Sequence, residues 1–389
     1  HRPNPSLVLA GIAASISSSF QILLPAVPVL VERHGPHGAA GAATASLFFG
    51  AVLGELLSPW LLTRWTSTRL LIGGQLLYAV PSLVYVIPAV TTWPMLAAAG
   101  LRGLGFGVSI VVSVALVAEL SQPHRRGTAI GYYGLALSVP GVVLPSLGVS
   151  LVEAGRIDVA AIIALTSGLF GAALAVLLPL SSAARVPGAG NLIDAARRPG
   201  LLALFAGFVI VSCSFGGVFT YAPVALPAEG LGSAAAFLFI AGATRAASRW
   251  LAGVLGDRRP ARLVLMGGIA ITLLGLVALA VPSGPIGVVM AATAYGTGYG
   301  AVQTAVYLVM VERGGAGWGP ISALWNSAID LGASLGGVLL GLSAARYGYA
   351  AAIWVMPAVM LISLPLFLWP ARRRLPTIPR SEEETKASA

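Results

Sequence analysis

Twelve apolar runs follow one another along this chain of 389 residues, and each is long enough to cross a lipid bilayer. A transmembrane helix needs about 20 mostly apolar residues. Inside hydrocarbon a lone segment must satisfy its own backbone hydrogen bonds, so each run is predicted to be an α-helix. The runs are 7–31, 41–62, 70–88, 93–120, 128–152, 159–179, 200–224, 233–255, 263–281, 286–312, 321–345 and 350–369. We therefore predict an all-α membrane protein with twelve transmembrane helices.

The composition supports a membrane protein. The chain is 57% hydrophobic and 9% charged, whereas a soluble domain carries about 25% charged residues. The single cysteine, Cys213, lies inside an apolar run, so no intramolecular disulfide can form and a small core residue is expected. The first apolar run continues as a full span, which argues against a cleavable signal peptide.

The order of the runs indicates two halves. Residues 1–180 are predicted to form an N-terminal bundle of six helices, and residues 199–371 a C-terminal bundle of six. Residues 181–198 form a polar connector that contains arginine, proline and glycine. Residues 372–389 are charged and polar and are expected to be a disordered tail.

The basic residues predict how the chain is oriented. With both termini on one side, that side holds 17 of the 23 Lys and Arg residues and the other side holds Arg33, Arg156 and Arg346. Loops rich in Lys and Arg stay in the cytoplasm, so both termini are predicted to lie in the cytoplasm and the chain in the plasma membrane. Nucleic-acid binding, the usual alternative for a net charge of +10, is not indicated, because the basic residues are spread over short loops.

Charged residues within the apolar runs are the strongest functional signal. Arg245 and Arg249 lie one helical turn apart in run 233–255, and the acids Glu55 and Asp330 lie in two other runs. A charge at membrane depth is expensive, so it usually faces the protein interior and takes part in function. The other polar residues in apolar runs are Arg102, Gln21, Gln75, Gln303 and Asn326. Aromatic residues near these positions could line an apolar pocket or only pack the helices; they are Phe20, Phe219, Tyr221, Tyr299, Tyr307 and Trp325.

The loop after run 233–255 carries a recognisable motif. Residues 253–262 read GVLGDRRPAR, which resembles the loop signature G-x-x-x-D-R-x-G-x-[RK] of the major facilitator superfamily. Gly253, Asp257, Arg258 and Arg262 match it, and Pro260 replaces the second glycine. The corresponding loop of the first half has Thr63 in place of the aspartate, and its arginines are Arg64 and Arg69.

Other segments support the same resemblance. Residues 126–131 open the fifth run as they often do in this superfamily. Gly134, Pro145 and Gly148 are similar to the fifth-span motif of its proton-coupled exporters, although Leu144 interrupts the pattern. Gly332, Gly336 and Gly341 in the eleventh run are also typical of the superfamily. The resemblance implies two pseudo-symmetric six-helix bundles and secondary transport by alternating access.

The resemblance and the intramembrane charges together suggest roles for individual residues. The residues predicted to bind substrate are Arg245, Gln21, Asn326, Tyr221, Trp325 and Arg102. Asp330 and Glu55 are predicted to carry the coupling proton, because burial and a nearby arginine shift carboxylate protonation in opposite directions. The residues predicted to act in gating are Gly253, Asp257, Arg258, Arg262, Arg249 and Arg64. Glu55 has an alternative role as the structural ion-pair partner of Arg249, which occupies the equivalent depth in the other half.

These observations predict a transporter that is not an enzyme. The four histidines lie in tails or loops, so a metal site at His34 and His37 has little support, and the sequence has no nucleotide-binding P-loop. We expect no cofactor, and an ion gradient must supply the energy. The predicted function is proton-coupled efflux of small amphipathic molecules, acidic or zwitterionic because intramembrane arginines outnumber acids. The alternatives are proton-coupled uptake of an organic anion and a non-transporting membrane sensor. The predicted partners are substrate, protons and lipid, and the chain is expected to be monomeric.

Overall fold

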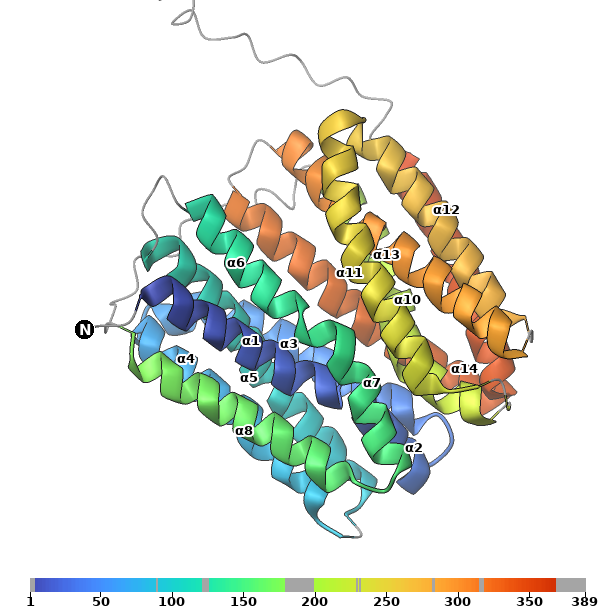
Figure 1. Cartoon of the computed structure of the whole chain (residues 1–389), viewed down its shortest axis with the longest axis horizontal. Coiled ribbons are helices and arrows are strands. Elements are labelled where there is room, and N and C mark those ends of the chain that lie inside the picture. The colour runs from blue at the N-terminus through green and yellow to red at the C-terminus, as the bar shows by residue number, and fades with distance from the viewer. Residues whose placement is uncertain are drawn as a thin grey trace, which may run out of the picture.

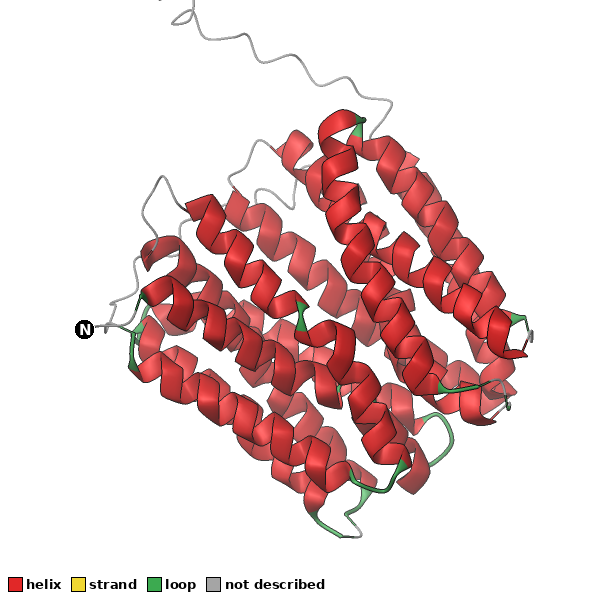
Figure 2. Ribbon diagram, viewed as in Figure 1, coloured by secondary structure: helices red, strands yellow, loops and turns green. Residues whose placement is uncertain are grey.

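A computed structural model of the chain describes residues 4–88, 90–120, 126–178, 199–228, 230, 232–281, 284–314 and 318–368. Within these ranges every regular element is a helix and no strand occurs (Figure 2). The predicted connector 181–198 and tail 372–389 lie outside the described residues. The fold is therefore all-α, as the sequence predicts.

Nine helical elements form the first half. They are α1 Pro5–Leu23, α2 Ala26–His34, α3 Ala39–Leu62, α4 Ser67–Ala79, the 3₁₀ helix η1 Val80–Val86, α5 Thr92–Leu120, α6 Arg126–Ser138, α7 Pro140–Glu153 and α8 Ile157–Val176. The second half has five longer elements. They are α10 Pro199–Ala228, α11 Ala234–Arg258, α12 Ala261–Ala280, α13 Gly284–Gly314 and α14 Trp318–Leu368.

Three predicted runs of the first half are each divided into two pieces. The breaks lie beside Pro25, Pro81 and Pro140, because proline has no backbone N–H to donate and its ring clashes with the preceding turn. Run 7–31 is therefore α1 followed by α2, and not the single helix that the sequence suggested. In the second half α14 contains both of the last two runs, and Gly348, with φ of 82°, separates them.

The lengths of these helices match a membrane-spanning bundle. Nine helical segments of the described chain are long and apolar enough to cross a bilayer. The 25-residue α11 and the 31-residue α13 are also long enough to cross a bilayer. The helix α14 covers two predicted runs. The described elements are therefore consistent with twelve spans arranged as two bundles of six.

Figure 1 shows the two halves side by side, with the blue to green helices of the first half next to the yellow to red helices of the second. We call the end of the bundle where α1 begins the basic side. It carries the described arginines of the α3–α4, α11–α12 and α13–α14 connections, which are Arg64, Arg69, Arg258, Arg259, Arg262 and Arg313. The other end, which we call the opposite side, carries Arg33, Arg156 and Arg346.

Glycines bring α3 and α5 into backbone contact. A Cβ atom added at Gly103 would collide with the carbonyl oxygen of Leu47, and one at Gly107 would collide with that of Ala51. Helices in lipid associate by close packing of small residues, because the hydrophobic effect does not drive helix against helix there. The small residues of α3 and α5 thus hold the helix that carries Glu55 in place.

Substitution of Gly103 by alanine should destabilise the bundle. The added methyl overlaps the backbone of α3, and overpacking of this kind costs about 1–3 kcal/mol. We expect a melting temperature several degrees lower for the purified protein in detergent. Gly73→Ala is the matched control, since a Cβ there meets nothing within 4 Å. Equal melting temperatures for the two variants would contradict the close-packing explanation.

Candidate functional site

The two halves meet along α3 and α14. Thr44 Oγ1 lies 2.6 Å from Thr220 Oγ1, and Ser334 donates to the carbonyl of Ala45 at 3.2 Å. The backbones of Gly41 and Gly337 approach so closely that neither position can accept a Cβ without displacement. In the described chain, the hydrogen bonds between the halves run from the opposite side as far as Glu55. The halves are thus closed together on the opposite side.

The two acids of the apolar runs form a pair across this interface. The carboxyl groups of Glu55 on α3 and Asp330 on α14 lie close to each other. Ser327 donates to Glu55 Oε2 at 2.8 Å, and Asp330 is only 7% exposed. Two carboxylates this close to each other repel, so a proton on either carboxyl group would stabilise the arrangement.

This geometry corrects one interpretation of the sequence. A structural ion pair between Glu55 and Arg249 was the alternative role for Glu55. Among the described residues the ion pairs within 4 Å involve neither residue. The interpretation is therefore wrong for this conformation, because Glu55 points to α14 and not to α11. Equal depth in the two halves does not imply the same direction around the helix axis.

Arg245 and Arg249 on α11 lie against aromatic rings. The Arg245 guanidinium carbon is 5.4 Å from the ring centres of both Phe215 and Phe219 on α10, and that of Arg249 is 5.8 Å from the Trp325 ring. Neither side chain has a carboxylate within ion-pair distance in the described part of the chain. A guanidinium over an aromatic face is attracted by the ring quadrupole. That attraction leaves the N–H donors around the guanidinium edge available.

Buried amides surround the arginines. An added Cβ on Gly141 of α7 would lie 3.1 Å from Gln21 Nε2 and 3.4 Å from Arg245 Nη2, so α1, α7 and α11 converge here. The Oε1 atoms of Gln21 and Gln303 are buried without a hydrogen-bond partner among the described residues. Unpaired buried polar atoms are costly. A polar guest that pairs with them would recover that cost.

The other predicted substrate residues on α14 are half-buried beside this cluster. Trp325 donates from its indole nitrogen to the carbonyl of Gln303 at 2.8 Å. Asn326 Nδ2 donates to the carbonyl of Ser322 at 3.0 Å, which leaves its amide oxygen available. We call these residues, the arginines, the amides and the carboxyl pair together the central cluster, which consists of Gln21, Glu55, Arg245, Arg249, Gln303, Trp325, Asn326 and Asp330. Its arginines and its carboxyl pair are separate parts that form no ion pair with each other among the described residues.

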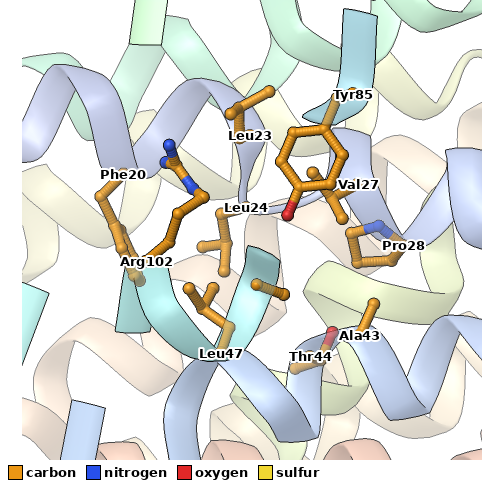
Figure 3. Close-up of a pocket in the computed structure, with 11 residues that line it drawn as sticks. Phe20, Leu23, Leu24, Val27, Pro28, Ala43, Thr44, Leu47, Tyr85 and Arg102 are labelled. Carbon is orange, nitrogen blue, oxygen red and sulfur yellow. The ribbon is translucent and has the colours of Figure 1, made fainter. Parts of the chain in front are cut away.

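Arg102 lies apart from the central cluster, inside the first half. Its guanidinium donates to the carbonyls of Tyr78 at 3.1 Å and Ser19 at 2.8 Å, and to Ser82 Oγ. Figure 3 shows it at the wall of a small apolar pocket beside Phe20 and Leu24. The pocket has about 300 Å³ of empty space but room for only about one water molecule. Arg102 thus joins α1, α4, η1 and α5, and its role in substrate binding remains a prediction.

Tyr221 also lies outside the central cluster. Its side chain is fully buried, and its hydroxyl accepts from the backbone N–H of Gly41 at 3.0 Å and donates to the carbonyl of Gly38 at 3.2 Å. The structure places this hydroxyl at the contact between the halves on the opposite side. The sequence indicated an aromatic residue near the site, but it could not show the direction of the ring.

Phe215, Ser327 and Gly141 also belong to the site, and the sequence alone did not indicate them. Phe215 lies one helical turn before Phe219, and this spacing places both rings on one face of α10. That spacing was the available signal for the second ring. Ser327 and Gly141 carried none, because small residues occur throughout the apolar runs.

Comparison with known proteins assigns the fold. Residues 7–320 match the family description "Major Facilitator Superfamily". The chain belongs to this superfamily. It is 28% identical over 296 residues to a chloramphenicol resistance protein of Streptomyces lividans, which covers 72% of this chain and 73% of the relative.

Solved structures of the superfamily share the fold. A bacterial homologue of the human lysosomal transporter Spinster, in an inward-facing and unoccupied conformation, aligns with a TM-score of 0.76 and 13% identity over 97% of this chain and all of that chain. A D-xylose–proton symporter aligns with a TM-score of 0.73 and 14% identity over 93% of this chain and 96% of that one. At such identities the likeness concerns the fold alone.

The gating residues predicted from the superfamily loop lie on the basic side. Asp257 and Arg258 are exposed at the end of α11, and a Cβ on Gly253 would meet nothing within 4 Å. Arg64 is exposed and lies 4.7 Å from the Trp60 ring centre, and Arg262 is half-buried on α12. Figure 1 shows α6 and α11 diverging toward this side. No ion pair of Asp257 occurs among the described residues, and its gating role stays a prediction.

Asp257→Asn should favour the conformation described here. If Asp257 stabilises closure of the basic side, its loss removes an interaction made only in the other state, and the populations move toward closure of the opposite side. The measurement is labelling of single cysteines on each side with a membrane-impermeant maleimide. Asp158→Asn is the control, because Asp158 lies on the opposite side, where its side chain is 45% exposed. An unchanged labelling ratio in Asp257→Asn would contradict the gating role.

Proposed function

We propose that the protein is a proton-coupled secondary transporter that exports small amphipathic molecules, acidic or zwitterionic, by alternating access. One observation carries the proposal, namely the separation of charges in the central cluster. Its two carboxyl groups lie next to each other, while its two arginines have no carboxylate partner among the described residues. The cluster can therefore hold a proton at one place and an anionic group at another.

The arginines provide the substrate part of the proposal. Arg245 lies between apolar aromatic rings and amide groups that have unpaired oxygen atoms. An anionic group on the substrate would accept from the guanidinium, and an apolar body would pack against Phe215 and Phe219. A hydroxyl or amine on the substrate would donate to Gln21 or Gln303. This combination describes an amphipathic guest that carries an acid.

The carboxyl pair provides the coupling part. A proton bound by the pair would neutralise one of two neighbouring acids on α3 and α14, and its loss would leave two like charges facing each other across the interface. Their repulsion favours separation of the two halves where α3 contacts α14. Binding and release of a proton thereby change the relative stability of the two conformations.

The proposal also includes the orientation of the chain in the membrane and the direction of substrate transport. The arginine distribution supports a cytoplasmic basic side in the plasma membrane. The similarity to a chloramphenicol resistance protein supports export. Uptake of an organic anion by symport is the second candidate, because arginines without a carboxylate partner in the described chain would bind an anion in either transport direction.

Purified protein in liposomes separates these alternatives. We would add amphipathic drugs, organic acids or metal chelates and follow internal pH with a trapped dye. Antiport moves protons against the direction of substrate movement, and symport moves them in the same direction. No proton movement with any of these compounds, in vesicles where the protein is shown to be folded, would contradict proton coupling.

Arg245→Ala should weaken substrate binding by at least about tenfold, since a hydrogen bond to a charged group contributes about 1.5–3 kcal/mol. Arg245→Lys keeps the charge but loses the planar donor edge, so an intermediate affinity is expected. Binding would be measured by calorimetry with a compound found in the vesicle assay. The control is Arg69→Ala, which removes an exposed arginine of the basic side. Unchanged affinity in Arg245→Ala would exclude it as a substrate ligand.

Asp330→Asn should stop transport driven by a pH gradient and preserve exchange of substrate without a gradient. The amide can still hydrogen-bond to Glu55 but cannot release a proton. Glu312→Gln, at an exposed position near the end of α13, is the control and should transport normally. If the Glu55→Gln, Asp330→Asn double variant still accumulates substrate when driven by a pH gradient, neither acid is the coupling site.

A further inference from the structure

A second set of contacts joins the halves at the opposite side, far from the central cluster. The turn between α2 and α3, residues 32–41, belongs to the first half, and two tyrosines of the second half reach it. Tyr349 follows the break in α14 at Gly348, and Tyr221 comes from α10. We refer to these two tyrosines and the turn 32–41 as the tyrosine latch.

Glu32 organises the turn. Its carboxylate accepts from the backbone N–H of Gly38 and of Ala40, both at 2.7 Å. These N–H groups begin α3, so Glu32 caps that helix and lies at the positive end of its dipole. The Glu32 side chain is only 7% exposed. A preorganised carboxylate therefore faces the second half.

Tyr349, from the second half, makes a further hydrogen bond to Glu32. Its hydroxyl donates to Glu32 Oε1 at 2.8 Å, and His37 Nδ1 lies 3.1 Å from the same hydroxyl. The His37 and Tyr349 rings are 4.5 Å apart. The bond is charge-assisted, and such bonds are about twice as strong as neutral ones. The positive φ of Gly348 turns the chain so that Tyr349 can reach across.

Tyr221 binds the backbone of the same turn. Its hydroxyl takes one hydrogen bond from Gly41 and gives one to Gly38, and its ring centre lies 6.4 Å from that of Tyr349. Gly38 has φ of 89°, and its carbonyl is held in place by the cap that Glu32 provides. The two tyrosines thus recognise one turn, one through a carboxylate and the other through the main chain.

We infer that the tyrosine latch is the gate contact that holds the halves together on the opposite side. Opening of that side must break the four hydrogen bonds that join the two hydroxyls to Glu32, His37, Gly38 and Gly41, while the contacts within the turn remain. Residues 32–41 then move with the first half, and Tyr221 and Tyr349 move with the second. The inference goes beyond the proposed function, because it involves neither substrate nor proton.

Removal of a single hydroxyl tests the latch without disturbing the turn. Tyr349→Phe leaves the ring and the capping of α3 intact, and Tyr221→Phe does the same for the backbone contact. Tyr347→Phe is the matched control, since Tyr347 lies two residues before Tyr349 and is 68% exposed. All variants carry Cys213→Ala, so that added cysteines are the only thiols.

Distances across the opposite side are measured by pulsed electron paramagnetic resonance in lipid nanodiscs, without substrate or gradient. Spin labels go on Ala154→Cys at the end of α7 and Ala228→Cys at the end of α10, both exposed. The parent and Tyr347→Phe should show mainly one short distance. Tyr349→Phe should raise the ratio of long to short distances about tenfold, as expected for a lost charge-assisted bond. The double Tyr221→Phe, Tyr349→Phe variant should raise it further.

A second label pair separates gating from general loosening. Labels at Thr63→Cys and Arg259→Cys, exposed on the basic side, should come closer in the same variants, because alternating access closes one side as the other opens. The inference is overturned if the double variant has the parent's distances on the opposite side. It is equally overturned if Tyr347→Phe shifts them as much as Tyr349→Phe, or if the basic side widens along with the opposite side.

Discussion

Backbone hydrogen bonding in hydrocarbon is the constraint on which this structure depends. Lipid offers no partner for an exposed N–H or C=O, so every described segment that crosses the bundle is helical. At Pro25, Pro81 and Pro140 the helix breaks and a new helix or a 3₁₀ turn follows, whereas Pro59 and Pro145 lie inside continuous helices. These breaks divide three spans of the first half into shorter pieces, whereas the long helices of the second half continue.

The same constraint determines how helices associate. In lipid the packing of small residues replaces the hydrophobic effect, and glycine provides the closest approach. Gly103 and Gly107 bring α5 against α3, and Gly41 and Gly337 bring α3 against α14. The helix α3 is therefore packed against a helix of its own half on one face and a helix of the other half on another. Glu55 and the capped turn at Gly38 both belong to it, so α3 connects the central cluster to the tyrosine latch.

The intramembrane arginines of this bundle differ in the contacts that their guanidinium groups make. Arg102 is satisfied by carbonyls and a serine of its own half and joins four elements. Arg245 and Arg249 are held only against aromatic rings in the described chain. Arg102 is thus hydrogen-bonded within its own half, whereas no hydrogen-bond acceptor for the Arg245 and Arg249 guanidinium groups occurs among the described residues. This difference explains why residue type and depth in the membrane were insufficient to tell them apart.

The sequence by itself determined the helical membrane fold, the limits of most helices and the superfamily, because hydropathy, arginine placement and the GVLGDRRPAR loop are local properties of the chain. It also identified Arg245, Glu55 and Asp330 as unusual, since a charge inside an apolar run is visible without a structure. Tertiary structure decided which groups meet. Glu55 pairs with Asp330 and not with Arg249, and Tyr221 binds the turn at Gly38, because the direction of a side chain depends on how its helix is rotated against its neighbours. The pairing of Glu32 with Tyr349, 317 residues apart, required the two halves to be brought together, and no local pattern encodes that contact.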